Sequence, residues 1–67
     1  MRYEIVLAGT DERLLSVALE GLVHRFGPDP STVVVRARDH AEIVGVVNRL
    51  HGLGLEIVSL RRVDAPV

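Results

Sequence analysis

Cysteine is absent from this chain of 67 residues. Disulfide bridges, thiolate zinc sites and iron–sulfur clusters are therefore excluded, because each of them requires cysteine side chains. The aromatic residues are also few, with only Tyr3 and Phe26 present. Two rings do not make the base-stacking platform of a protein that binds single-stranded nucleic acid. Nothing else in the sequence indicates a metal or a cofactor, and we expect neither.

Lysine is absent as well, so all eight basic residues are arginine, against nine acidic residues and a formal net charge of −1. This balance lacks the basic excess of nucleic-acid-binding domains, and we expect no nucleic-acid partner. Long apolar runs are missing, and the chain starts with the strand-like "MRYEIVLAG" in place of a basic and apolar leader. We therefore expect a cytoplasmic protein without membrane contact.

The small size of the chain predicts one domain over residues 1–67, with a frayed tail at residues 63–67. A domain this short lies near the lower limit at which one hydrophobic core is sufficient. Nearly half of the residues, 48%, are hydrophobic. Both observations favour a homodimer or a higher symmetric oligomer, in which a second copy covers apolar surface.

The first half of the chain predicts a strand, a short helix and a hairpin. Tyr3, Ile5 and Leu7 alternate with more polar positions, which is typical of a half-buried strand over residues 2–8. A short helix follows, with Thr10 or Asp11 as its N-cap and its end near residue 21. The turn sequence "GPDP" then separates two further predicted strands, residues 22–26 and 32–38. In an alternative interpretation, "LVHRF" extends the first helix and only three strands remain.

The second half predicts a longer helix and a last strand. Asp39 and Glu42 have the spacing of a capping box, and apolar residues follow at helical spacing over residues 40–52. Those apolar residues are Ile43, Val46, Val47, Leu50 and Leu53. Gly52 and Gly54 are candidates for a left-handed turn at the helix end. The segment "LEIVSLRRV" predicts the fourth strand.

Together these elements predict an α+β fold of ferredoxin-like type, a βαββαβ sandwich with two helices on one face of a four-stranded antiparallel sheet. If Tyr3, Ile5 and Leu7 face the helices, the opposite face is left uncovered. We expect Val6, Ala8, Val34, Val58 and Leu60 to form an apolar patch there, next to Arg36, Arg38 and Arg62. On this interpretation Glu4 lies towards Arg38.

Two segments resemble a known family. "AGTDERLLSVAL" is similar to the loop and first helix of ACT-type domains, with Asp11, Leu14 and Leu15 at the matching positions. The ending "LHGLGLEIVSLRRV" looks like the close of ACT-like chains and of short actinobacterial proteins of unknown function. The resemblance implies a small regulatory fold that forms pairs and often holds an amino acid at the interface between the two copies.

The same resemblance implies a candidate ligand site at Thr10, Asp11 and Arg13, where the first strand meets the first helix. Arg13 stands where the family usually has glycine, and the acidic residues at positions 11 and 12 would repel a carboxylate. We therefore expect weak or absent amino-acid binding in this loop. Arg36 and Arg38 form the alternative site for an anion, because an arginine presents a bidentate fork to a carboxylate.

The sequence contains no nucleophile elbow, phosphate loop or paired metal-ligand motif. We therefore predict a non-enzymatic dimerising module of ACT-like type that regulates or scaffolds another protein, with or without a small ligand. The alternative is a small enzyme, or an enzyme accessory protein, that holds an anionic metabolite on the open sheet face through Arg36, Arg38 and Arg62.

Overall fold

The computed structural model describes residues 1–9, 12–29 and 31–63. Its elements, in chain order, are β1 (Arg2–Leu7), α1 (Glu12–Ala18), β2 (His24–Phe26), β3 (Thr32–Arg36), α2 (His40–Gly52) and β4 (Ile57–Arg62). This βαββαβ order was predicted from the sequence and is confirmed. The boundaries of α2 agree with the prediction, while each strand is shorter by one to three residues.

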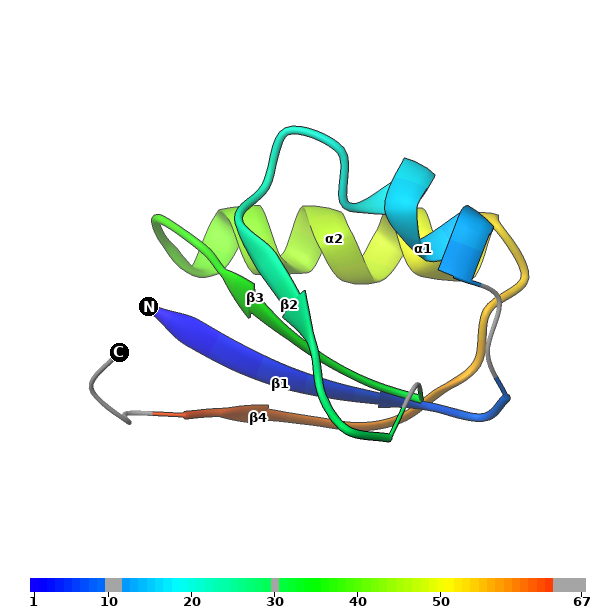
Figure 1. Ribbon diagram of the computed structural model, residues 1–67. Helices are drawn as coiled ribbons and strands as arrows, with labels where there is room; N and C mark the ends of the chain where they lie inside the picture. The colour runs from blue at the N-terminus through cyan, green and yellow to red at the C-terminus, as the bar shows by residue number, and fades with distance from the viewer. Residues whose placement is uncertain (10–11, 30, 64–67) are drawn as a thin grey trace.

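The four strands form one antiparallel sheet in the order β2-β3-β1-β4. β1 and β2, the strands joined by α1, are separated by β3, and β3 and β4, joined by α2, are separated by β1. Two interleaved βαβ units of this kind make the predicted ferredoxin-like arrangement. Both helices lie on the same face of the sheet, and the other face is uncovered (Figure 1).

The core lies between the helices and the sheet. The strict alternation of β1 buries Tyr3, Ile5 and Leu7, as the period of two predicted. The other buried apolar residues are Val33 and Val35 from β3, Ala37 after it, Leu15, Ala18 and Leu19 from α1 and its end, and Ile43, Val46 and Leu50 from α2. One apolar face of each element is therefore sufficient to build a single continuous core.

Helix α1 is short and is fixed at its C-terminal end. The residues predicted as its N-cap, Thr10 and Asp11, lie outside the described residues. The chain leaves the helix through Gly21, whose φ of 84° is readily adopted only by glycine. The Arg49 side chain of α2 donates a hydrogen bond of 2.9 Å from Nη1 to the Ala18 carbonyl oxygen. This cation at the carbonyl end of α1 ties the two helices together.

The predicted hairpin between β2 and β3 is confirmed, and the three-strand alternative is wrong. Phe26 pairs with Val33 in register, and the Gly27 amide donates to the Thr32 carbonyl at 2.9 Å. In the turn, the Asp29 carboxylate accepts bonds from both the amide and the hydroxyl of Ser31. These two bonds, the amide bond first, lower the pKa of Asp29, so the turn is held by an ionised aspartate.

Helix α2 begins at a cap formed by Asp39, whose carboxylate accepts a bond of 2.9 Å from the Glu42 amide. A reciprocal capping box would direct Glu42 to the Asp39 amide, but its carboxylate accepts from the Arg38 amide one residue earlier, at 3.0 Å. At the other end Gly54 has the left-handed φ of 80°, whereas Gly52 is the last helical residue. Of the two candidate glycines, Gly54 therefore makes the left-handed turn and Gly52 does not. Leu53, the last of the apolar residues at helical spacing, is 36% exposed.

A β-bulge in β4 corrects the predicted facing of that strand. Leu7 pairs with Ile57 but Val6 pairs with Ser59, so Val58 is an extra residue between them. Beyond the bulge the side chains change faces, and Leu60 lies on the helix side of the sheet, opposite Ile5. Leu60 and Arg62 were predicted on the uncovered face and are on the helix side instead.

Candidate functional site

The uncovered face of the sheet is the candidate functional site. Side chains directly opposite each other on neighbouring strands project to the same face, so the strand register assigns its members. They are Arg2, Glu4 and Val6 from β1, Thr32, Val34 and Arg36 from β3, Arg25 from β2, and Ser59 and Arg61 from β4. Among these residues four are arginine and one is acidic, although the whole chain carries a net charge of −1.

The basic end of this face, defined as Arg2 and Arg36, consists of two arginines in direct opposition. Met1 and Ala37 exchange two backbone hydrogen bonds, of 2.7 and 2.9 Å. The two pair types alternate along antiparallel strands, so the next pair, Arg2 and Arg36, is of the non-hydrogen-bonded type. Side chains approach more closely in a pair of this type. Like charges in direct opposition are unfavourable. The strand register gathers two positive charges at this end of the face, which favours an anionic partner.

Glu4 lies in the middle of the face and forms an ion pair with Arg61 of β4, at 3.0 Å between Oε1 and Nε. This hydrogen bond, together with the Glu4 charge, raises the pKa of Arg61. The predicted approach of Glu4 to Arg38 is wrong. Arg38 follows the end of β3 and pairs with Glu42 at 2.9 Å, while Val34 lies opposite Glu4 on β3.

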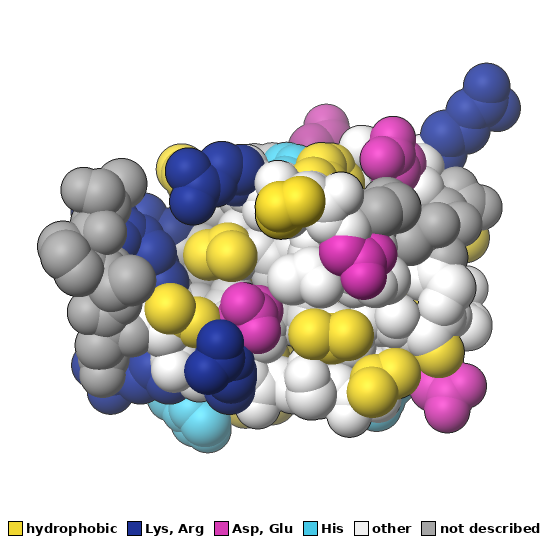
Figure 2. Space-filling model, turned by 60° about the horizontal axis from the view of Figure 1, so that its bottom comes forward, with side chains coloured by type: hydrophobic (Ala, Val, Ile, Leu, Met, Phe, Trp, Pro, Cys, Tyr) yellow, Lys and Arg dark blue, Asp and Glu magenta, His cyan; other side chains and the backbone are white. Residues whose placement is uncertain are grey.

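An apolar centre formed by Val6, Val34 and Val58 separates the basic end from an acidic end. Val6 and Val34 are half-buried between the longer side chains around them, and Val58 is 63% exposed. Hydrophobic side chains extend across this face, and arginines gather at one side of it (Figure 2). The predicted apolar patch is therefore confirmed for these three valines and reduced by the loss of Leu60.

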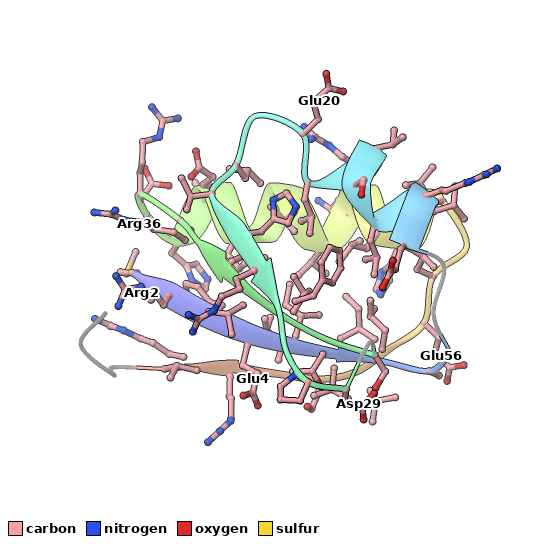
Figure 3. The ribbon with its side chains drawn as sticks, viewed as in Figure 1. Arg2, Glu4, Glu20, Asp29, Arg36 and Glu56 are labelled. Carbon is pink, nitrogen blue, oxygen red and sulfur yellow. The ribbon has the colours of Figure 1, made fainter. Side chains whose placement is uncertain are left out.

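The acidic end is defined as Asp29 and Glu56. The Ala8 amide donates to the Glu56 carbonyl at 2.9 Å, which continues the β1–β4 ladder and places Glu56 on the uncovered face beside Ala8. Asp29 lies in the β2–β3 turn at the same end. Arg2 and Arg36 lie at one end of the sheet, and Asp29 and Glu56 lie at the opposite end (Figure 3). The face is thus electrically polarised along the strand direction.

The residues predicted to bind a ligand divide into two groups. Thr10 and Asp11 lie outside the described residues, and Arg13 is exposed in the first turn of α1. Arg36 and Arg38, the alternative anion site, line one surface groove together. Arg62, which the sequence placed with them, lies opposite Tyr3 on the helix side and does not join them.

Arg2, Arg25 and Arg61 were not predicted as members of the charged face. Arg2 lies two positions before Glu4 on β1, so the two side chains face the same side of the sheet. The alternation in the sequence was sufficient to predict this. Arg25 could be assigned only once the hairpin register paired it with Val34. Arg61 was hidden by the bulge in β4, because an extra residue reverses the alternation beyond it.

The histidines and acidic residues of the described chain form no group of three or more that could hold a metal ion. His40 and His51 are exposed at the two ends of α2. His24 is half-buried, with Nδ1 2.9 Å from the Leu22 carbonyl oxygen and its ring edge against Phe26. In the described ranges, neither helix has the length and apolar character needed to cross a membrane.

The family described as Domain of unknown function (DUF8691) matches residues 2–61, a range that includes both helices and nearly the whole sheet. No curated protein and no solved structure matches the chain significantly. The family model therefore spans both helices and nearly the whole sheet as one unit. Its description assigns no activity to the uncovered face.

Proposed function

Because the chain belongs to DUF8691, a family whose description names no activity, we propose a function from the geometry of the sheet: a non-enzymatic dimerising module that scaffolds or regulates a larger assembly. The single observation that carries the proposal is the uncovered sheet face, with an apolar centre between a basic end and an acidic end. Such a face is complementary to a second copy of itself.

The sheet edges are poor sites for pairing two copies. β2 has only three residues and is followed directly by Gly27 and Pro28. β4 is longer, but the bulge at Val58 interrupts its regular backbone, and Arg61 and Arg62 occupy its end. Short edges, bulges, prolines and edge charges all oppose strand addition. Association through the sheet must therefore use its face.

The size of the protein leads to the same conclusion. A stable interface typically takes about 800 Å² of accessible surface from each partner. That is about one fifth of the 4411 Å² exposed by this domain. An edge contact of a few residues is too small, whereas one whole face of the sheet has the required extent.

Charge determines the orientation of the two copies. Two sheets stacked face to face can be related by a two-fold axis that lies between them. If the axis is perpendicular to the strands, the basic end of each copy lies over the acidic end of the other. An axis along the strands would instead oppose Arg2 and Arg36 to the same arginines of the second copy. The first arrangement places Glu56 and Asp29 within reach of arginine, so electrostatic complementarity favours antiparallel packing of the sheets.

Light scattering after gel filtration tests this proposal with a matched pair of variants. Val58→Asp introduces a charge at the apolar centre, and Val17→Asp introduces the same charge on α1, at a site of similar exposure, 60% against 63%. We expect twice the chain mass for the wild type and for Val17→Asp, and a monomer for Val58→Asp. A monomeric wild type at about 10 μM, a concentration at which interfaces of standard size are normally occupied, would refute the proposal.

Reversed charges test the orientation. Arg36→Glu and Glu56→Arg should each weaken the homodimer, because each brings like charges together at both ends of the interface. A mixture of the two variants should form a heterodimer, since one chain then presents only acidic and the other only basic groups at these positions. Arg38→Glu, which changes an arginine outside the face, should leave the dimer intact. Two variants that do not complement each other would exclude the antiparallel arrangement.

A further inference from the structure

A surface groove of about 800 Å³ lies on the other side of Arg36, between the start of β2 and the start of α2. It shares Arg36 with the basic end of the uncovered sheet face, while its other lining residues lie outside that face. Its charged wall is formed by Arg36, Arg38 and Glu42, and its apolar wall by Leu22, Val23 and Ala37. The volume falls within the range of about 300–1,000 Å³ that is typical of small-molecule sites.

The charged wall is held in place by the entry into α2. Glu42 accepts the Arg38 amide at 3.0 Å through one oxygen and Arg38 Nε at 2.9 Å through the other. Its side chain is 19% exposed, whereas that of Arg38 is 86% exposed. The pKa of Glu42 is lowered, chiefly by the bond from the Arg38 amide, so this carboxylate is ionised and anchors the arginine.

The two arginines keep donors for a ligand. Only Nε of Arg38 bonds to Glu42, which leaves both terminal nitrogens of its guanidinium at the solvent. Within the described part of the chain, the Arg36 guanidinium has no ion-pair partner. Met1 also lines the groove, and its N-terminal ammonium donates to the Ala37 carbonyl oxygen at 2.9 Å. With Glu42 counted, the lining carries two net positive charges, which is suited to an anion.

The opposite wall is formed by apolar side chains that the buried core does not cover. Val23 is 69% exposed, the highest value among the large hydrophobic residues of the described chain. Leu22 next to it is half-buried, and Ala37 forms the buried floor between the two arginines. A ligand with an apolar part would cover Val23 and gain the free energy of that burial.

We propose that this groove binds a small carboxylate with an apolar body, such as a short aliphatic or branched acid. The carboxylate lies between the Arg36 fork and the terminal nitrogens of Arg38, and the hydrocarbon part packs on Leu22 and Val23. Arginine is suited to the planar carboxylate because its donors match both oxygens.

Nuclear magnetic resonance titration of the labelled wild-type protein tests the proposal with four probes. Hexanoate is expected to shift the backbone amides of Val23, Ala37 and Arg38 in a saturable way. Acetate lacks the apolar body and hexylamine carries the opposite charge, so each should bind at least tenfold more weakly than hexanoate. Hexyl phosphate tests whether the site prefers a phosphate to a carboxylate. Hexylamine binding as tightly as hexanoate would refute the role of the arginines, and tighter binding of hexyl phosphate would refute the carboxylate assignment.

Variants locate the binding. Arg36→Gln and Arg38→Gln should each weaken hexanoate binding at least tenfold, while Arg25→Gln, an exposed arginine outside the groove, should bind like the wild type. Val23→Asp places a charge in the apolar wall and leaves both arginines unchanged, so it should also abolish binding. This variant keeps the test decisive if an arginine variant does not fold. Equal binding by Arg25→Gln and Arg36→Gln, or unchanged binding by Val23→Asp, would overturn the proposal. Arg36 also belongs to the basic end of the sheet face, so Arg38→Gln and Val23→Asp, which change residues outside that face, keep the test independent of the dimer.

Discussion

Truncation of Leu50 to alanine is expected to remove much of the stability of this domain. Leu50 is 0% exposed and extends from α2 into the core. Such truncations cost about 2–5 kcal/mol, and more where the surroundings cannot collapse into the cavity. Here α2 is held at both ends, by the Asp39 cap and by the bond from the Leu55 amide to the Leu50 carbonyl at 3.0 Å. We therefore expect about 3.5–5 kcal/mol, the upper half of that range.

That loss is large relative to the whole stability. At about 0.05–0.15 kcal/mol per residue, a domain of this length is stable by roughly 3–10 kcal/mol. Urea unfolding followed by circular dichroism measures the change, at one fixed protein concentration because dimerisation would add to the apparent stability. Val44→Ala is the matched control, since Val44 lies on the same helix but is 44% exposed. A Leu50→Ala variant as stable as Val44→Ala would refute the assignment of the buried face of α2.

Two further predictions concern the start of α2. Asp39→Ala should lower the free energy of unfolding by about 1 kcal/mol, because the Glu42 amide loses its acceptor, and an unchanged urea midpoint would contradict the cap. The pKa of Glu42 is lower in the folded than in the unfolded protein, where it is about 4.3. Its stabilising contribution is therefore complete above that unfolded value and is lost as the pH falls through the folded pKa. Unfolding from pH 7 to pH 2 should show a shallower acid limb in Glu42→Gln than in the wild type, and superimposable pH profiles would contradict this assignment.

The sequence predicts best where the signal is local. The boundaries of α2 agree with the prediction because an aspartate cap, a run of apolar residues at helical spacing and a left-handed glycine all lie within sixteen consecutive positions, from Asp39 to Gly54. The hairpin is equally local, since the turn around Asp29 is flanked by β-branched residues on one side. Each of these features depends on neighbours in the chain and requires no knowledge of the sheet.

Predictions fail where the determining contact is distant in sequence. The facing of Leu60 and Arg62 depends on an extra residue that appears only when β4 is aligned with β1. The partner of Glu4 depends on the same alignment, which brings Arg61 beside it in place of Arg38. An alternation counted from the sequence is correct up to the bulge and reversed beyond it, because the period of two carries no information about an insertion.

The candidate site shows the same division. Arg36 and Arg38 could be selected from the sequence because they alternate on one predicted strand, and they do line a common groove. The opposition of Arg2 and Arg36 could not be predicted in this way, because it requires the register of β1 against β3. Charges that gather from separate strands become a site only in the folded sheet, so composition alone, with its net charge of −1, conceals them.

The bulge in β4 connects the edge of the sheet with its face. By inserting Val58, it disturbs the edge that a second strand would need for regular hydrogen bonding, which opposes edge-to-edge pairing. The same insertion leaves Val58 and Ser59 on the uncovered face and directs Leu60 towards the helices. It also brings Arg61 opposite Glu4, where the ion pair neutralises the only acid in the middle of that face. One extra residue therefore disfavours association through the edge and at the same time supplies the apolar centre through which association by the face becomes favourable.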